Sequence, residues 1–183
     1  MKETNLHTET DSHRIQACLR GDAQAQSELY HRYAAKLYAI CLRYMGEPDT
    51  ARDMLQETWI KAFTKLGEFK AQGSFEGWLR RIAVTTCLDS IKSDRMRFST
   101  DIEEHATLQD EAPSLDSRMD AGRLLKLIEQ LPVGYRVVFN LFAIEGYGHS
   151  EIADLLSISE NTSKSQLFKA RKWLQERLID EKK

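Results

Sequence analysis

Apolar side chains recur at three- and four-residue steps along most of the chain, a spacing that predicts amphipathic helices. In the first half the pattern is interrupted at Gly21, at Gly46 with Pro48, and over residues 67–73. Four helices are therefore predicted there, and Asp22 and Ser74 are suitable N-caps for the second and the fourth. Short connections between four helices make a compact bundle.

The second half of the chain shows the same helical spacing. A helix over 124–131 is stopped by Pro132, and the next apolar segment, 135–144, is rich in aromatic and β-branched residues. That composition also fits a strand, but the length of the segment and its helical neighbours favour a helix. Gly146 and Gly148 then turn the chain into its last segment.

The segment from Ser150 to Leu178 predicts two helices joined by a tight turn. Ser150 and Ser159 are suitable N-caps, and Ser157 closes the first helix. The second helix has a stripe of apolar residues that is expected to be buried: Leu167, Ala170, Leu174 and Leu178. A short helix, a turn and a longer basic helix form a helix-turn-helix, whose second helix lies in the DNA major groove.

The charge of this second helix leaves two interpretations open. From Ser159 to Arg177 there are five Lys or Arg and two Glu, a net of +3. An ordinary helical hairpin with a solvated charged face has the same pattern and is commoner in general. Phe168 favours DNA binding, because a large aromatic side chain among basic residues on the outer face has no structural role there and can contact a thymine methyl group.

Composition and charge separate the chain into parts. With 183 residues, 42% of them hydrophobic and 30% charged, the chain fits one large or two small domains and is expected to be mostly helical. The net charge of −2 conceals +3 over residues 78–98 and −6 over residues 99–120. The acidic stretch has few large apolar residues and is expected to be a flexible linker. The predicted fold class is all-α: a disordered N-terminus at 1–11, a four-helix domain at 12–98, the acidic linker at 99–116 and a helix-turn-helix domain at 117–183.

The reactive side chains form no recognisable catalytic or metal site. Cys18, Cys41 and Cys87 match neither a zinc spacing nor a redox pair, so they are expected to be buried thiols. Glu28 and His31 form a single E-x-x-H step, whereas a di-iron bundle needs two such pairs and further carboxylates. No enzyme, cofactor, metal or small-molecule substrate is predicted. The absence of an apolar run of membrane-spanning length, and of an apolar signal core near Met1, predicts a cytoplasmic protein.

Two stretches of the first domain and the end of the chain resemble a known family. DTARDMLQETWIKAF (residues 49–63) and FEGWLRRIAVTTCLDSIKSDRMR (75–97) resemble the second region of bacterial sigma factors. EGYGHSEIADLLSISENTSKSQLFKARKWLQERL (145–178) resembles their fourth region. With an acidic linker between them and no third domain, the chain from 12 to 178 is similar to the extracytoplasmic-function (ECF) branch of the sigma-70 family.

The resemblance implies a surface for core RNA polymerase on the third helix. In the family, a D-x-x-Q-E motif docks on the clamp coiled coil of the polymerase, and here the motif is Asp53, Gln56 and Glu57. The three residues are neighbours on one helical face by their spacing. Without the resemblance, a solvated acidic patch is the simpler interpretation of the same three residues.

The resemblance also implies that the first domain recognises the −10 element of the promoter as a single strand. In the family, the loop before the fourth helix captures unstacked bases, and here that loop is 67–73. Phe75 and Trp78 lie on the apolar stripe and are assigned to the core rather than to base stacking. Thr85 stands where the family often has Asn, and its hydroxyl can donate a hydrogen bond with a shorter reach. The candidate −10 residues are Arg80, Arg81, Thr85, Lys92 and Arg95.

The last helix would read the −35 element as a duplex. Ser163 stands where the family has an apolar residue, on the buried side, so looser packing is expected there. Gln166 replaces a common Arg, which would remove one DNA contact, and Ser157 stands where turns prefer Gly, which predicts a modest strain. The candidate −35 residues are Asn161, Lys164, Ser165, Phe168, Lys169 and Lys172.

Together the two regions imply an alternative RNA polymerase sigma factor, with core RNA polymerase and promoter DNA as its partners. Members of this branch are often held by an anti-sigma factor, although no residue of this chain identifies one. The alternative is a stand-alone helix-turn-helix transcriptional regulator. The Q-E-T and W-L-R-R motifs of the first domain argue against it, because a simple repressor has no use for them.

Overall fold

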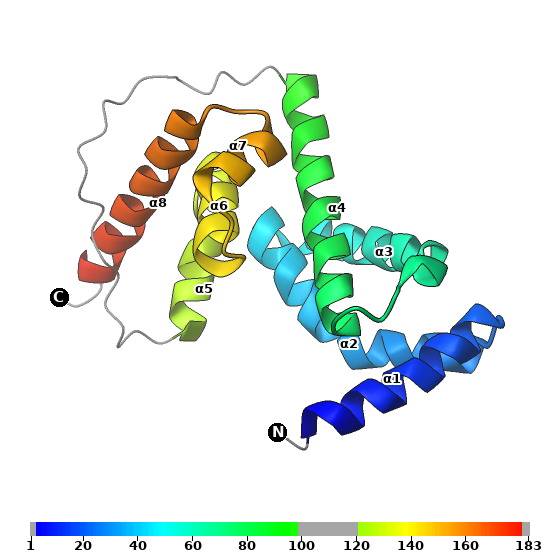
Figure 1. Ribbon diagram of the computed structural model, residues 1–183. Helices are drawn as coiled ribbons and strands as arrows, with labels where there is room; N and C mark the ends of the chain where they lie inside the picture. The colour runs from blue at the N-terminus through cyan, green and yellow to red at the C-terminus, as the bar shows by residue number, and fades with distance from the viewer. Residues whose placement is uncertain (1–2, 99–120, 181–183) are drawn as a thin grey trace. The chain divides into compact units, whose positions relative to one another are not determined.

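The computed structural model describes residues 3–98 and 121–180, and within these residues all regular structure is helical (Figure 1). The all-α prediction is confirmed. The chain divides into two compact units, one made of residues 1–42 and 48–87 and the other of residues 43–47 and 88–183. Each unit is described by itself below. The predicted linker at 99–116 lies outside the described residues.

The first unit is built on the helices that the apolar spacing predicts. They are α1 (Glu3–Leu19), α2 (Ala23–Met45), α3 (Pro48–Thr64), the short 3-10 helix η1 (Leu66–Glu68) and the first half of α4 (Phe75–Phe98). Asp22 Oδ1 accepts hydrogen bonds from the backbone N–H groups of Gln24 (2.9 Å) and Ala25 (3.1 Å). Ser74 Oγ accepts one from Gly77 N–H at 3.0 Å. Both predicted N-caps are therefore present, because each side-chain oxygen satisfies N–H groups that have no partner within the helix.

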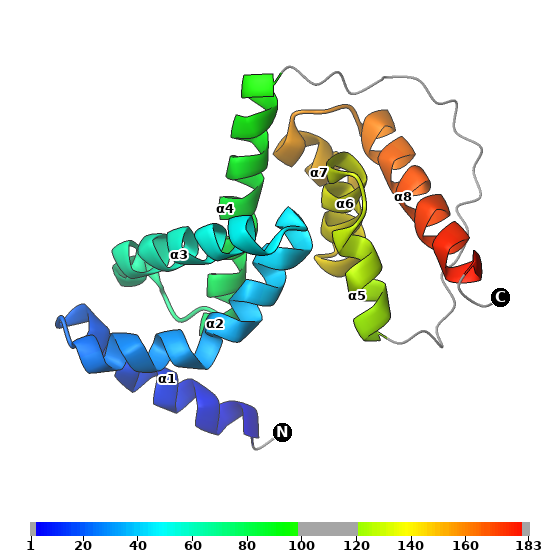
Figure 2. The same cartoon turned by 180° about the vertical axis from the view of Figure 1, so that it is seen from behind.

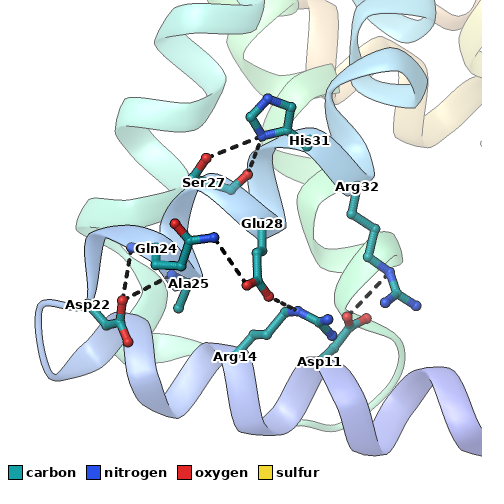
Figure 3. Close-up of polar contacts among 9 residues, drawn as sticks. All are labelled: Asp11, Arg14, Asp22, Gln24, Ala25, Ser27, Glu28, His31 and Arg32. Atoms are coloured by element: carbon teal, nitrogen blue, oxygen red, sulfur yellow. Dashed lines mark hydrogen bonds and ion pairs between the residues drawn. The ribbon is translucent and has the colours of Figure 1, made fainter.

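The beginning of the chain differs from the prediction. The segment 1–11 was expected to be disordered, but α1 already begins at Glu3. Asp11, inside this helix, is only 6% exposed and accepts a hydrogen bond from the Tyr33 hydroxyl of α2. Arg14 Nε of α1 also donates to Glu28 Oε2 of α2 at 2.7 Å (Figure 3). These contacts join α1 to α2 through side chains that are far apart in sequence. Local sequence patterns do not reveal such contacts, so they did not predict an ordered helix here.

The apolar stripes of α2, α3 and α4 are buried. Trp59 is 4% exposed and stacks on the half-buried Phe63 with ring centroids 5.2 Å apart. Cys18, Cys41 and Cys87 are buried free thiols, as the sequence predicts. Cys41 and Cys87, distant in sequence, are hydrogen-bonded to each other, and this contact lowers the pKa of the Cys41 thiol against the opposing effect of its burial.

The second unit contains α5 (Ala121–Glu129), α6 (Val133–Phe139), η2 (Asn140–Ile144), α7 (His149–Leu156) and α8 (Glu160–Asp180). The helix predicted over 135–144 is confirmed, but its last five residues are π-helical. In this unit α8 packs against both α6 and α7 (Figure 2). Val137, Val138 and Phe139 are buried in α6.

A buried cation closes the end of α5. Arg136 is 7% exposed, and its Nη1 donates to the carbonyl oxygens of Glu129 (2.8 Å) and Leu131 (3.0 Å). The last carbonyl groups of a helix have no partner within the helix, so a guanidinium satisfies them well. Burial lowers the pKa of Arg136, with the nearby Glu129 opposing that effect. No helix within 3–98 or 121–180 is both long enough and apolar enough to cross a membrane.

Candidate functional site

The turn between α7 and α8 has the geometry of a helix-turn-helix. Ser157 ends α7 in the left-handed conformation, with φ 55° and ψ 48°. A side chain other than glycine is strained there, which confirms the strain predicted at this position. Ser159 Oγ accepts a hydrogen bond from the Thr162 N–H at 3.0 Å and caps α8, as predicted.

The cap of α7 is different from the predicted one. Ser150 was expected to be the N-cap, but α7 begins at His149 and the cap residue is Gly148. Glu151 provides the hydrogen bond instead, because its Oε2 accepts from the Gly148 N–H at 2.7 Å. This is the backward half of a capping box, which a Glu three residues after the cap can form without a hydroxyl at the cap itself.

All six candidate −35 residues lie outside the buried side of α8. Asn161, Lys164 and Lys172 are exposed, whereas Ser165, Phe168 and Lys169 are half-buried. The Ser165 hydroxyl donates to the Thr162 carbonyl at 3.0 Å, so the oxygen can serve DNA as an acceptor. Phe168 is not part of the buried stripe, in contrast to Leu167, Ala170 and Leu174, which are at most 4% exposed. The outer surface of α8 therefore combines cations with the partly exposed ring of Phe168.

Gln166 and Ser163, which depart from the family pattern, have different roles in the structure from those that the sequence predicts. Gln166 is 8% exposed, so the substitution affects the interior of the unit rather than a DNA contact, and the expected loss of a contact is not supported. Ser163 is fully buried, and its hydroxyl hydrogen-bonds to His149 Nδ1 at 2.9 Å. The His149 ring also stacks on Phe142 with centroids 4.6 Å apart. A polar pair therefore occupies the place where looser apolar packing was expected.

The His149 contact should make the stability of α7 and α8 depend on pH. Burial is the main cause that lowers the pKa of His149, with Lys164 and Arg171 adding to it and Glu160 opposing it. Because the unfolded chain binds the proton more readily, the stabilisation is complete above the unfolded pKa of about 6.5 and decreases as the pH falls toward the lower, folded pKa. Hydrogen exchange of α7 and α8 amides should therefore show a smaller opening free energy at pH 5.5 than at pH 7.5.

A His149→Gln variant provides the control for this prediction, because carboxyl groups elsewhere also begin to titrate in this pH range. The variant keeps a polar side chain near Ser163 but cannot take up a proton. Its opening free energy should change less between the two pH values than that of the wild type. An equal change in both proteins would show that His149 is not responsible.

The α3 surface carries the three candidate docking residues and one that the sequence did not suggest. Asp53 and Gln56 are exposed, and the half-buried Glu57 pairs with Lys61 at 3.7 Å. Ile60 is 61% exposed, one turn beyond Gln56 on the same face. The signal was present in the sequence, since Ile60 falls between the positions of the buried stripe. Single exposed aliphatic side chains are common on protein surfaces, so Ile60 is informative through its place beside the three candidate docking residues.

The α4 residues assigned to −10 recognition differ from one another in exposure. Arg81 and Thr85 are exposed, and Arg80 and Lys92 are half-buried. The Thr85 hydroxyl donates to the carbonyl oxygens of Arg81 (2.9 Å) and of Ile82 (3.0 Å), so it can accept but not donate toward DNA. The expected hydrogen-bond donation from Thr85 is therefore not supported. Arg95 lies outside the residues whose side chains the structure describes.

A cavity of about 770 Å³ adjoins the loop that precedes α4. Its wall includes Phe69, which the sequence did not suggest, and which makes ring contacts with Phe75 at 5.2 Å and Trp78 at 5.5 Å. Phe75 is 4% exposed and belongs to the core as predicted, whereas Trp78 is only half-buried. Ala71, with φ 54°, is held in the left-handed region within the same loop. Strained backbone of this kind is often found where a ligand is bound.

Glu28 and His31, the single E-x-x-H pair of α2, are used in hydrogen bonds with other residues of the chain. Glu28 accepts hydrogen bonds from Arg14 and Gln24, and the resulting pKa of Glu28 is lowered, chiefly by Arg14 (Figure 3). His31 Nδ1 lies 2.7 Å from the Ser27 carbonyl oxygen. Within the described residues, no group of three or more His, Cys, Asp or Glu side chains could hold a metal ion.

Comparison with known proteins finds both of the regions that the sequence resembles. The family description Sigma-70 region 2 matches residues 29–97, and Sigma-70, region 4 matches residues 121–174. RNA polymerase sigma-H factor of Pseudomonas aeruginosa is 29% identical over 178 residues, covering 91% of this chain and 92% of that protein. ECF RNA polymerase sigma factor SigW of Bacillus subtilis is 28% identical over 182 residues, covering 91% and 96%.

A solved structure of the sigma factor RpoE in complex with the anti-sigma factor NepR, from Bartonella quintana, has 22% sequence identity to this chain. The match covers 84% of this chain and 96% of the RpoE chain, with a TM-score of 0.48. The helical architecture, the two region matches in the expected order and relatives of almost the same length agree with one another. The chain belongs to the extracytoplasmic-function sigma factors of the sigma-70 family, which are non-enzymatic subunits for transcription initiation.

Proposed function

We propose that three separate surfaces of this chain carry out the steps of promoter recognition. The α3 surface, defined by Asp53, Gln56, Glu57 and Ile60, docks on core RNA polymerase. The outer surface of α8 reads the −35 element as a duplex, and the loop before α4, with α4 itself, holds the −10 element as a single strand. Polymerase performs the chemistry, and the chain contributes specificity and strand opening.

The exposed Ile60 among polar residues is the observation that carries this proposal. An aliphatic side chain that is 61% exposed contributes little to the core of its own unit. Burial of such a side chain against a partner stabilises a complex by about 25 cal/mol for each Å² removed from water. A stand-alone regulator that uses only α7 and α8 gives no reason for this surface, so the polymerase-bound function accounts for more of the molecule.

The −35 reading is supported by the outward cations and by the accessible ring of Phe168. Lysines near the phosphate backbone bind without sequence preference, whereas groups that reach base edges discriminate between sequences. The exposed Lys164 and Lys172 suit the first role, and Phe168 suits contact with a thymine methyl group. The same face is therefore able to position the helix and to select a sequence.

A transcription experiment tests the proposal directly. Purified core RNA polymerase is incubated with a genomic pool of promoter fragments, with and without the chain, and run-off products are sequenced. The chain should bind core polymerase and direct initiation at a set of promoters that share −35 and −10 elements. If the chain neither binds core polymerase nor starts transcription on any fragment, the proposal fails. A sigma factor works where polymerase and chromosome are, so we place the protein in the cytoplasm.

A further inference from the structure

The cavity beside the loop before α4 is closed on one side by α1. Asp11 and Ile15 of α1 line it, together with Tyr33 of α2 and with Phe69 and Arg80 from the loop and α4. A volume of about 770 Å³ is within the range of pockets that bind small organic ligands. The matched segment of the family begins at residue 29, so α1 lies outside it.

Asp11 connects α1 to two other side chains of the cavity wall. Its Oδ2 accepts the hydrogen bond of the Tyr33 hydroxyl. Its Oδ1 lies 3.5 Å from Arg32 Nε (Figure 3). Arg32 also lines the cavity, and its guanidinium lies 5.7 Å from the centre of the Tyr33 ring. Burial and the Asp11 contact both raise the pKa of Tyr33, so its hydroxyl stays protonated and continues to donate.

The buried Tyr33 hydroxyl needs an acceptor, but a neutral side chain would satisfy it, so this hydrogen bond alone does not require a carboxylate. Only 8% of the Asp11 side chain and 28% of the Arg32 side chain are exposed. A buried ion pair costs so much desolvation that well-packed apolar side chains stabilise a fold at least as well. What the pair does provide is a fixed direction for the guanidinium, a planar group whose five N–H donors suit phosphates and base edges.

We propose that α1 completes the −10 site, with Asp11, itself held by the Tyr33 hydroxyl, as a positioning residue that holds Arg32 against one unstacked nucleotide in the cavity. The inference rests on the proposed function and adds a residue outside the matched region. The half-buried ring of Phe69 provides the apolar surface that a base needs. Arg32 supplies the charge-assisted hydrogen bonds to the same nucleotide, and Asp11 acts on the nucleotide only through Arg32.

An abasic scan tests the role of Asp11. The chain is combined with core polymerase and a fork-junction DNA whose −10 strand is single, taken from a promoter found in the run-off experiment. Each −10 base is replaced in turn by an abasic site, and DNA affinity is measured by fluorescence anisotropy. In the wild type, one position should show the largest loss, because its base occupies the cavity.

The Asp11→Asn variant keeps the size of the side chain and an acceptor for Tyr33 but removes the charge that holds Arg32. Its affinity for intact DNA should fall about tenfold, since a hydrogen bond with a charged group contributes about 1.5 kcal/mol. Its affinity for DNA that is abasic at the cavity position should match that of the wild type. The loss of affinity caused by removing that base is therefore smaller in Asp11→Asn than in the wild type. A merely structural effect on α1 would lower the affinity for both DNAs equally.

Two further variants keep the result interpretable. Arg32→Gln removes the partner without changing α1 and should reproduce the Asp11→Asn result, and combining both should cause no further loss. Glu28→Gln breaks the exposed Arg14 pair between the same two helices, away from the cavity, and should leave the scan unchanged. An equal loss by Asp11→Asn on intact and abasic DNA would overturn the proposal.

Core binding is measured separately with a labelled chain, so that failures can be told apart. Normal core binding by the wild type without any base-dependent position would overturn the cavity proposal alone. Absence of core binding would count against the α3 surface and remove the basis of both proposals.

Discussion

The Asp53→Lys, Gln56→Ala double variant should bind core RNA polymerase about 100-fold more weakly than the wild type, because residues at the centre of an interface often contribute more than 1 kcal/mol each. Both side chains are exposed, so the fold of α3 should not change. Affinity is measured by titrating labelled chain with core enzyme. Helical content and thermal unfolding serve as folding controls.

A charge reversal elsewhere separates the docking surface from a general effect of net charge. Glu176 of α8 is exposed, and Glu176→Lys changes the charge of the chain by the same amount as Asp53→Lys. This variant should bind core polymerase as the wild type does. Equal weakening by both substitutions would mean that the α3 surface has no special role.

The Ile60→Ala variant examines the apolar part of the same surface. Because the side chain is 61% exposed, its truncation should leave thermal stability nearly unchanged. Removal of most of a buried aliphatic side chain from an interface should weaken core binding about tenfold. If binding is unaffected, the docking surface ends at Glu57 and does not include Ile60.

The Lys164→Ala, Phe168→Ala double variant should lose dependence on the −35 element and still bind core polymerase normally. Loss of the Phe168 base contact should reduce discrimination by about 1–3 kcal/mol. Loss of the Lys164 charge should weaken binding to intact and scrambled duplexes alike, so the two duplexes should become nearly equal in affinity. Initiation is compared on templates with an intact and a scrambled −35 element. Loss of core binding instead would contradict the separate roles of the two units.

Arg177→Ala provides the matched control on the same helix. Arg177 lies at the far end of α8, with its guanidinium 3.5 Å from the centre of the Trp173 ring. Its replacement removes one positive charge from α8, as Lys164→Ala does, but not from the proposed DNA surface. The variant should therefore keep the preference for the intact −35 element, apart from a small uniform loss of affinity.

Features that depend on neighbours in sequence could be predicted. The caps Asp22, Ser74 and Ser159 act on N–H groups two or three residues away, so the residue type and its position are sufficient. The outer residues of α8 follow from helical spacing once the buried stripe is known. The cap of α7 was placed wrongly at Ser150, because the reach of Glu151 back to Gly148 competes with it.

Features that depend on distant contacts could not be predicted. Asp11 and Tyr33 are 22 residues apart, and His149 and Ser163 are 14 apart, so no local pattern brings either pair together. The position of Gln166 was misjudged for a related reason. Similarity to the family gives the residue type at each position, whereas burial depends on how α8 rotates against α6 and α7 in this chain.

The π-helical segment η2 makes this part of the chain sensitive to length. Each residue of an α-helix turns the chain by about 100°, and a π turn closes a wider ring that holds one extra residue. Deletion of one residue from 140–144 would let the segment close as an ordinary α-helix and rotate Phe142 away from His149. The supporting contact beneath α7 would then be lost, although no side chain of the DNA surface had changed. Insertions and deletions here should therefore be tolerated far less than substitutions.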